Sequence, residues 1–354
     1  MALLEISDKK VPSIEIIVNS VPLQIPEVKS VLDVSVSQYM SPPNYFKLSL
    51  FDPELKMLDR EKGILREGSR IEINMGYAGN LKKMLVGEIA AVTADFSNDA
   101  AVTIQIEGYD LLHRLSRGTF FRKFEGATDD SGLPDSEIVS MIASEMKLVP
   151  SVDSTQQRNE ARVQNHVSNL VFLEELARMN GFYIWMDGDT LNFKKTPPQA
   201  EPIQLKWGAN LISFSARLSI SGLVNEIEVR GWEQVQKQAF SAKVQRPDDS
   251  TAEFSREGQT LISQGSGGVS GMVLWNTQIS SQQEAKEYAE TAMTQQRQVI
   301  TGSGACIGQP DMRAGSQLEI SSIGRFEGTY TVQEVRHTYG PGGYLTFFQV
   351  GRML

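Results

Sequence analysis

Strict alternation of apolar and polar side chains is the feature of this sequence that most constrains its fold. In residues 31–38, "VLDVSVSQ", the apolar Leu32, Val34 and Val36 alternate with aspartate and serine. A period of two residues is that of a β-strand with one buried face, whereas an amphipathic helix repeats every 3.6 residues. Residues 45–51 alternate in the same way. The start of the chain is therefore predicted to form a sheet.

Further short strands follow at even spacing through the first hundred residues. They are separated by turn clusters at Gly76–Asn80 and at residues 97–99, and they include "PSIEIIVN", "RIEINMGY", "KKMLVGEIAAVTADF" and "AAVTIQIEG". Many short strands with few helices are typical of a closed or nearly closed barrel. Residues 1–108 are therefore expected to form a first barrel-like β domain.

Residues 109–200 change in character and are predicted to be an α+β middle domain. A short helix is expected near residue 111, and a longer helix is predicted in "LPDSEIVSMIASEMK", with Ile138, Met141, Ile142 and Met146 on its buried face. The stretch "SNLVFLEELARMNGFYIWMDGDTLNFKK" then predicts a helix followed by a hairpin. Ser168 or Asn169 can cap that helix, Gly181 can end it, and Asp187-Gly188-Asp189 suits a tight turn.

Strands return in residues 201–354, which are predicted to be a second barrel-like β domain. A polar, glycine- and serine-rich excursion is expected at 246–275, and a capping box from Ser281 to Glu284 predicts a helix at 281–296. The first and last parts of the chain are similar in style, but no internal repeat of fixed period is evident. The fold class is therefore mainly β with an α+β insertion.

Composition excludes several classes of function. The chain has 354 residues, a formal net charge of −9 and a pI near 5.1, and its lysines and arginines form no basic stripe, so sequence-specific nucleic-acid binding is not expected. No apolar run is long enough to span a membrane, and the N-terminus lacks the pattern of a secretory signal. A single cysteine, Cys306, permits no internal disulfide and fits assembly in the cytoplasm as a small buried side chain.

The search for chemistry finds no catalytic, cofactor-binding or metal-binding constellation. His113, His166 and His337 are far apart in sequence and lack metal-ligand spacing. His337 could be a pH-sensitive contact or a residue at the edge of a core, and the second interpretation is favoured. Asp187 and Asp189 could act as paired carboxylates, but a tight turn explains them better. No cofactor and no enzymatic activity are therefore expected.

Two alternatives from other functional classes stay open. A cell-wall-degrading hydrolase would need convergent carboxylates or a histidine with a partner. A glycan- or receptor-binding module would use Tyr183 and Trp185 on an exposed face, because aromatic rings stack on sugars. Packing in a core or an interface is the simpler interpretation of these aromatic residues.

Four stretches, in the same order, resemble the contractile-tail hub family, which includes phage late control protein D, tail hub proteins and the base of type VI secretion spike proteins. They are "GYAGNLKKMLVGEIAAV", "IEGYDLLHRLSRG", "FLEELARMNGFYIWMDGDTLNFKK" and "MRAGSQLEISSIGRFEGTYTVQEVRHTYGPGGYLTFFQVGR". Together they span most of the chain, and it is their order rather than any single motif that is specific.

The resemblance implies two barrel-like β domains per chain and a homotrimer with pseudo-sixfold symmetry. It also implies a structural hub in a virion or injection-particle baseplate that joins a hexameric tail tube to a trimeric central spike. Baseplate wedge components, and cargo or a tape-measure protein in the lumen, are further implied partners. Because the chain ends at Leu354, the spike is expected to be a separate polypeptide. A phage tail, a phage-derived particle and an extracellular injection system remain equally compatible.

Interfaces between copies and with neighbours would then carry the function. The predicted contact segments are the outer face of the first strands, the turn at 76–80, the polar excursion and the last strands. The individual residues that we expect at interfaces are Gly76, Tyr77, Tyr183, Trp185, Gly315, Tyr330 and His337.

Overall fold

The computed structural model describes most of the chain between residues 11 and 353. The ranges outside the description are 24–29, 60–62, 97–101, 127–131, 157–160, 198–200, 220–223, 225, 234–236, 246–270, 276–278, 280 and 296–297, together with both ends. Most of the predicted polar excursion, residues 246–270, therefore lies outside the described residues.

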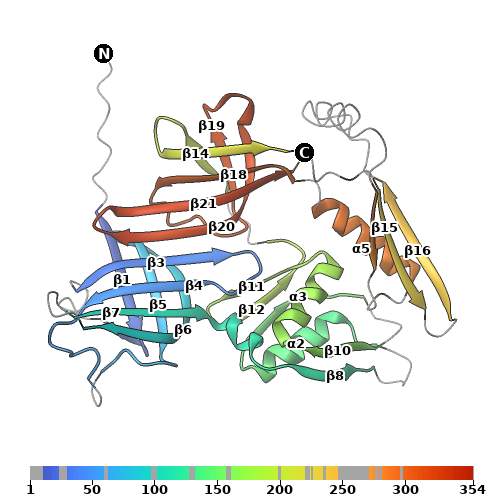
Figure 1. The fold of residues 1–354 in the computed structure, drawn as a ribbon, viewed down its shortest axis with the longest axis horizontal. Coiled ribbons are helices and arrows are strands. Elements are labelled where there is room, and N and C mark those ends of the chain that lie inside the picture. The colour runs from blue at the N-terminus through green and yellow to red at the C-terminus, as the bar shows by residue number, and fades with distance from the viewer. Residues whose placement is uncertain are drawn as a thin grey trace.

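The first part of the chain forms strands, as the alternation predicts (Figure 1). They are β1 (Pro12–Val18), β2 (Val21–Pro22), β3 (Val31–Tyr39), β4 (Tyr45–Phe51), β5 (Arg70–Tyr77), β6 (Asn80–Asp95) and β7 (Thr103–Asp110). Val34 and Val36 are buried, but Leu32 is 43% exposed. A bulge between Val31 and Asp33 shifts the register there and turns Leu32 outward, so its predicted place on the buried face is wrong.

The middle of the chain contains the predicted helices and hairpin. Its elements are η1 (Leu111–Ser116), β8 (Phe120–Phe124), α2 (Asp135–Glu145), β9 (Val149–Val152), β10 (Arg162–Val167), α3 (Asn169–Asn180), β11 (Tyr183–Asp187) and β12 (Thr190–Lys194). The Ser168 hydroxyl caps α3 by accepting from the Val171 N–H, and Gly181 ends the helix in the left-handed conformation. In α2, Met141 is 46% exposed and Val139 is buried, so the stripe predicted there is wrong at Met141.

The described residues of the last part return to strands and include the helix α5. The elements are β13 (Ile203–Lys206), β14 (Leu211–Leu218), β15 (Glu226–Glu233), β16 (Gln238–Gln245), β17 (Gly271–Trp275), α5 (Gln282–Gln295), β18 (Gln298–Ile307), β19 (Gln317–Ser321), η2 (Gly324–Phe326), β20 (Gly328–Gly340) and β21 (Gly343–Met353). Ser281 caps α5 as predicted, because its Oγ accepts from the Glu284 N–H at 3.2 Å. The last five residues of the predicted excursion form β17, which pairs with β15.

The described strands close no barrel, so the prediction is wrong where it allowed closed barrels; that the two β domains are nearly closed stays a prediction. A 13-stranded sheet instead runs through the first and last parts of the chain in the order β14-β18-β21-β20-β3-β4-β7-β6-β5-β1-β2, with β19 pairing β20 and β13 pairing β19. The long strand β20 makes this continuity possible. It pairs with β19 near its start, and its second half pairs with β3 (Figure 1).

The described residues form three hydrophobic cores. One is built from β1 to β7, and another is built from β13, β14 and β18 to β21. The third contains the helices and hairpin of the middle of the chain, together with Ile227, Val229, Ala242 and the buried face of α5. We call the three groups of elements the first β unit, the second β unit and the middle unit. The domain boundaries at 108/109 and 200/201 stay a prediction.

The two β units have the same strand order. In the first unit the order is β3-β4-β7-β6-β5-β1, and in the second it is β14-β18-β21-β20-β19-β13. Every pair in one unit has the same direction as the corresponding pair in the other, with one exception. β1 pairs with β5 antiparallel, whereas the corresponding strands β13 and β19 pair in parallel. The first and second β units are therefore two versions of one topology.

The register repeats as well. β3 and β14 each have a bulge at their start, between Val31 and Asp33 and between Leu211 and Ser213. β6 and β20 each have a bulge at the same point of the ladder, after Ile89 and after Val332. Bulges in matching places are specific, because each one fixes how the strands around it align.

A short loop before β5 and β19 carries the same repeat into the sequence. The Gly68 N–H donates to the Ile89 carbonyl at 2.8 Å, and the Gly315 N–H donates to the Val332 carbonyl at 2.8 Å. These loops read "REGSRIEI" and "RAGSQLEI". The repeat has no fixed period in the sequence, because β15, β16, β17 and α5 are inserted between β14 and β18 and make the spacing unequal.

Candidate interaction surfaces

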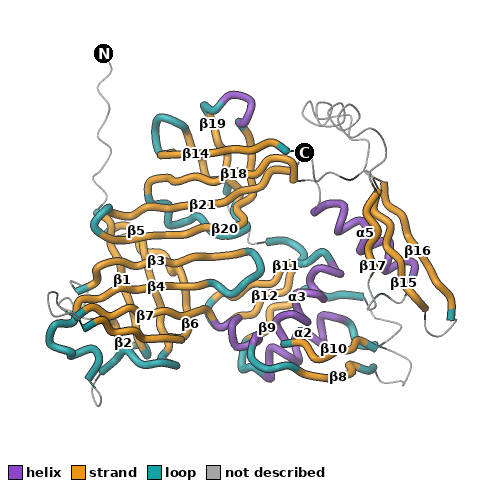
Figure 2. The backbone as a smooth tube through the Cα atoms, viewed as in Figure 1, coloured by secondary structure: helices purple, strands orange, loops and turns teal. Residues whose placement is uncertain are grey.

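The contact between the two β units is an antiparallel strand pair, which we call the joint. Residues 334–339 of β20 pair with residues 39–34 of β3, and Figure 2 shows the two strands side by side. Val36 lies opposite His337, and both side chains are 0% exposed. Val335 lies opposite Gln38, whose amide nitrogen donates to the Met84 carbonyl at 2.6 Å. The side chains on one face of the joint are therefore buried, and the packing continues across it from one β unit to the other.

His337 is fully buried at the joint and serves as a fixed hydrogen-bonding group. Its Nε2 donates to the Met312 carbonyl at 3.0 Å, and its Nδ1 accepts from the Tyr344 hydroxyl at 2.9 Å. Burial, and then the positive charge of Arg313, lower the pKa of His337 to about 3. This arrangement agrees with the favoured interpretation of a core residue, and its side chain is not available to a second chain.

Tyr77 also connects the two β units within one chain. Its hydroxyl donates to the Gly308 carbonyl at 2.8 Å, and its ring lies 5.8 Å from the ring of Tyr344. Gly76 precedes it at a φ of 158°, where an added Cβ would lie 2.5 Å from the Asn80 carbonyl oxygen. The turn predicted at 76–80 therefore needs glycine for a close backbone approach.

Three of the expected interface residues, Tyr183, Trp185 and Gly315, line one cavity. This junction cavity, of about 220 Å³, lies where β3 and β6, the β11–β12 hairpin and the loop at 313–315 meet. Nothing in the sequence around these three residues places them together. The structure brings them to the meeting point of the first β unit, the second β unit and the middle unit.

Arg313, which sequence analysis missed, helps to fix this junction. Its guanidinium donates to the carbonyls of Pro310, Met312 and Lys83 at 2.6, 2.9 and 2.8 Å, and the last bond reaches β6 of the first unit. Burial lowers the pKa of Arg313. In the matching loop of the first β unit, Arg66 donates to the Gly63 carbonyl at 3.0 Å. A comparison of the two loop sequences would have drawn attention to both arginines.

Tyr330, another expected interface residue, belongs to the core of the second β unit. It is 1% exposed, and its hydroxyl donates to the Phe326 carbonyl. Its ring packs against Phe214 at 5.6 Å. Its side chain therefore stabilises the second unit itself.

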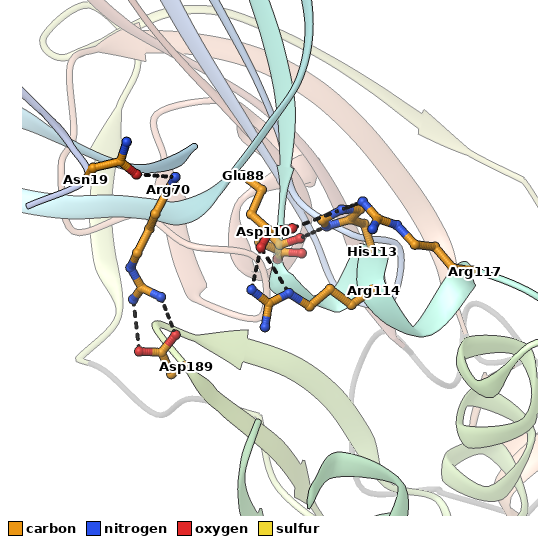
Figure 3. Close-up of polar contacts among 8 residues, drawn as sticks. All are labelled: Asn19, Arg70, Glu88, Asp110, His113, Arg114, Arg117 and Asp189. Atoms are coloured by element: carbon orange, nitrogen blue, oxygen red, sulfur yellow. Dashed lines mark hydrogen bonds and ion pairs between the residues drawn. The ribbon is translucent and has the colours of Figure 1, made fainter. Parts of the chain in front are cut away.

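A polar seam attaches the middle unit to the first β unit (Figure 3). Arg70 on β5 makes two hydrogen bonds to the Asp189 carboxylate, at 2.6 and 2.9 Å. The hydrogen bond from Arg70 lowers the pKa of Asp189. Asp189 lies in the turn between β11 and β12, as the sequence predicted. From this turn its carboxylate binds Arg70 and attaches the hairpin to the first β unit.

The seam continues around Glu88 on β6. Arg114 donates to the Glu88 carboxylate, which also lies 3.5 Å from His113 Nε2. Arg117 donates to that same Nε2 at 2.9 Å, so the His113 proton is on Nδ1, facing the Asp110 carbonyl at 2.7 Å. Burial alone would raise the pKa of Glu88, but the hydrogen bond and charge of Arg114 outweigh it and lower the pKa.

Asp110 ends β7 and caps η1 at the edge of the seam (Figure 3). Its Oδ1 accepts from the Leu112 N–H at 3.1 Å, and the residue is 3% exposed. Burial raises the pKa of Asp110 to about 7, against the opposing effect of hydrogen bonds from Asn44 and Leu112. The seam thus combines an exposed ion pair with a buried carboxyl group.

The described part of the chain contains no cluster of three histidine, cysteine, aspartate or glutamate side chains that could hold a metal ion. Cys306 is buried, and burial raises the pKa of its thiol to about 12. None of the helices described here has the length and apolar character that crossing a membrane requires.

A family model matches residues 8–340 of this chain. The matching family is described as Alg8 N-terminal domain. The chain belongs to the Alg8 N-terminal domain family. That description names a domain and states no activity. No curated protein matches this member of the Alg8 N-terminal domain family.

Solved structures share the fold over nearly the whole length. A 43 kDa tail protein of prophage MuSo2 from Shewanella oneidensis has a TM-score of 0.71 at 12% identity, with 96% of this chain and 98% of that chain covered. An Escherichia coli component of the type VI secretion system, described as similar to the bacteriophage T4 tail proteins gp27 and gp5, has a TM-score of 0.61 at 11% identity, covering 96% and 79%. A Francisella PdpA–VgrG complex gives 0.56 at 8%, covering 99% and 59%.

Proposed function

We propose that this chain is the structural hub of a contractile tail or injection particle, a homotrimeric adaptor between a hexameric tail tube and a trimeric central spike. The observation that carries the proposal is the repeat within one chain. Two β units with the same strand order, register and bulges give three copies of the chain six similar units. A ring with threefold symmetry can then present a nearly sixfold surface on one side.

The shared fold supports the setting of this proposal. Proteins described as a prophage tail protein, a type VI secretion component and part of a VgrG complex have this fold over most of this chain. We infer that the tube protein contacts the ring of β units and that a separate spike protein binds the opposite side. Baseplate wedge proteins would surround the hub, and cargo or a tape-measure protein would pass through its lumen. Assembly would begin in the cytoplasm.

We propose that this function involves no catalysis. The Asp189 carboxylate is occupied by Arg70, and the buried His337 donates to a backbone carbonyl and accepts from a hydroxyl. Both residues act as structural contacts between parts of the chain. The cell-wall hydrolase therefore gains no support from these two positions.

Native mass measurement tests the proposal. The full chain is measured alone, then with its tube protein, then with its spike protein, and the complex is imaged by electron microscopy. We expect three copies on the particle axis between tube and spike. A single copy off the axis, touching neither tube nor spike, would contradict the proposal, and so would a monomer that persists with both proteins added. A tube protein from an unrelated particle is the control for nonspecific association.

A further inference from the structure

Each of the two strands of the joint has a counterpart in the other β unit, and these two counterpart segments, both within the described chain, do not pair with each other. Residues 91–96, at the end of β6, correspond to residues 334–339 of β20, because the bulges after Ile89 and Val332 align the two strands. Residues 214–219, in and after β14, correspond to residues 34–39 of β3. Each β unit therefore contains one segment of the β3 kind and one of the β20 kind. The joint pairs β3 of the first unit with β20 of the second, so the end of β6 and the strand β14 remain.

Within the described residues, the end of β6 and the strand β14 (Leu211–Leu218) each have an edge that pairs with no other strand. β6 pairs with β5 only as far as Glu88 and then pairs with β7 alone. β14 pairs with β18 on one side and ends the order of the sheet. An open edge presents backbone N–H and C=O groups that can pair with another strand.

Exposure separates the used segments from the open ones. In the joint, Val36, Val335 and His337 are each 0% exposed. Their counterparts on the open edges, Ala216, Val92 and Ala94, are half-buried, and the aromatic ring of Phe96 is 68% exposed. The open edges therefore carry apolar side chains that a second strand pair of the same kind would cover.

We propose that residues 91–96 of one copy pair antiparallel with residues 219–214 of the next copy, in the register of the joint. This inference rests on the proposed homotrimer and names the contact that holds it together. The register sets Val92 opposite Leu218, Ala94 opposite Ala216, and Phe96 opposite Phe214, all on one face. The copy-to-copy contact is thus a second version of the contact inside the chain.

The other face of this pairing is polar and complementary. Thr93 lies opposite Arg217, and Asp95 lies opposite Ser215, which places Arg217 diagonal to Asp95. Diagonal neighbours in an antiparallel ladder are within reach of long side chains, so the two charges attract. The pairing brings together one cation and one anion from different copies.

Pairing of this kind closes a ring without leaving either edge open. The joint inside each chain alternates with the joint between chains, and both have one register. The sheet then continues from copy to copy through β6, β7, β4, β3, β20, β21, β18 and β14. Both of these segments are then paired in every copy, so the ring closes through them.

Disulfide cross-linking in the assembled full chain tests the register. Asp95→Cys and Ser215→Cys are made in separately tagged copies, mixed with tube and spike proteins and oxidised. Directly opposite residues have Cβ atoms about 4.5–5.5 Å apart, near the spacing that a disulfide bridges. We expect linked pairs carrying both tags, and a covalent trimer from the double variant. Cys306 is buried and gives no background.

Two matched variants make the result specific. Thr338→Cys with Ser35→Cys is the corresponding pair in the joint and should link within one chain, because these residues lie opposite each other. Asp95→Cys with Ser213→Cys is shifted by two residues and should link far less. Trimers of normal mass without the Asp95–Ser215 link would overturn the inference and leave the proposed function standing. Persistent monomers with both partners present would overturn both.

Discussion

The two β units differ in how they fill the same framework. In the first unit, Phe46 on β4 is fully buried and its partner strand β3 carries the smaller Val34. In the second, the position of Phe46 is taken by Gly302, and Phe214 takes the place of Val34. The large ring thus comes from one strand in the first unit and from the neighbouring strand in the second. Register can persist while the source of core volume changes.

The units also differ in what attaches to them. Arg70, Glu88 and Asp110 form the polar seam with the middle unit. Their counterparts in the second β unit are Gln317, Thr331 and Arg352. The seam is therefore confined to the first unit. The repeat supplies the framework, and a few substitutions on it decide which side holds the middle unit.

Removing the ring from the first core should have the largest effect. Phe46→Ala leaves a cavity, and a change of this kind typically costs about 3–5 kcal/mol of folding free energy. The urea concentration at the unfolding midpoint should fall accordingly. An effect below the range of surface substitutions would show that the first unit collapses around the gap and that the comparison of cores is wrong.

The matched change in the second unit adds volume. A Cβ added at Gly302 would lie 2.7 Å from the Phe214 ring, so Gly302→Ala should destabilise by about 1–3 kcal/mol through overpacking. Phe214→Val in the same chain should relieve part of that cost. If the two changes were merely additive, the ring and the glycine would not be coupled.

Acid should act on the second unit through His337. Its pKa is lowered to about 3 in the folded chain, against 6.5 for an ordinary histidine, so the unfolded chain binds the proton more readily. The contribution of the neutral imidazole is complete above pH 6.5 and is lost as the pH falls toward 3. The slope is at most about 1.4 kcal/mol per pH unit. Urea unfolding between about pH 4 and 6.5, inside the window that these two pKa values set, measures it.

Two variants isolate this slope. His337→Gln should be destabilised at neutral pH. The slope of its unfolding free energy against pH should be lower by the contribution of this one titrating side chain. His166→Asn is the control, because His166 is exposed and has a positive φ that asparagine tolerates, and it should keep the full slope. Equal slopes in the parent and His337→Gln chains would contradict the assignment.

Much of the local structure could be predicted from the sequence. Alternation predicted the strands around Val34, the capping residues Ser168 and Ser281 predicted helix starts, and Gly181 predicted a helix end. Each of these signals acts over a few residues. Which strands pair is decided by contacts distant in sequence, so the sheet that runs continuously through both β units was not predicted.

The candidate site was less predictable for the same reason. Tyr183, Trp185 and Gly315 were chosen separately, and only the fold brings them to one cavity. Arg313 was missed because a single arginine in a loop carries no signal until the matching loop with Arg66 is recognised. The repeat itself was hidden by the elements inserted between β14 and β18.

The open edges offer a smaller and more specific test of the comparison. Phe96→Ser should change the stability of the isolated chain by no more than about 0.5 kcal/mol, because the side chain is exposed. Its counterpart in the joint, Tyr339, packs against the first core, and Tyr339→Ser should cost about 1–3 kcal/mol. Sedimentation of the assembled particle should show that only Phe96→Ser weakens association without weakening the fold.

The polar seam should show the smallest energetic effect. Arg70→Gln gives the first unit the residue that the second has at Gln317, and it removes both hydrogen bonds to Asp189. Both side chains are about half exposed, so the pair should contribute no more than about 1 kcal/mol. A double-mutant cycle with Asp189→Asn measures that coupling, which should weaken with salt. Because Arg70 lowers the pKa of Asp189, the coupling should also disappear as acid protonates the carboxylate. A coupling that persisted in acid would mean that the middle unit is held to the first β unit by packing rather than by charge.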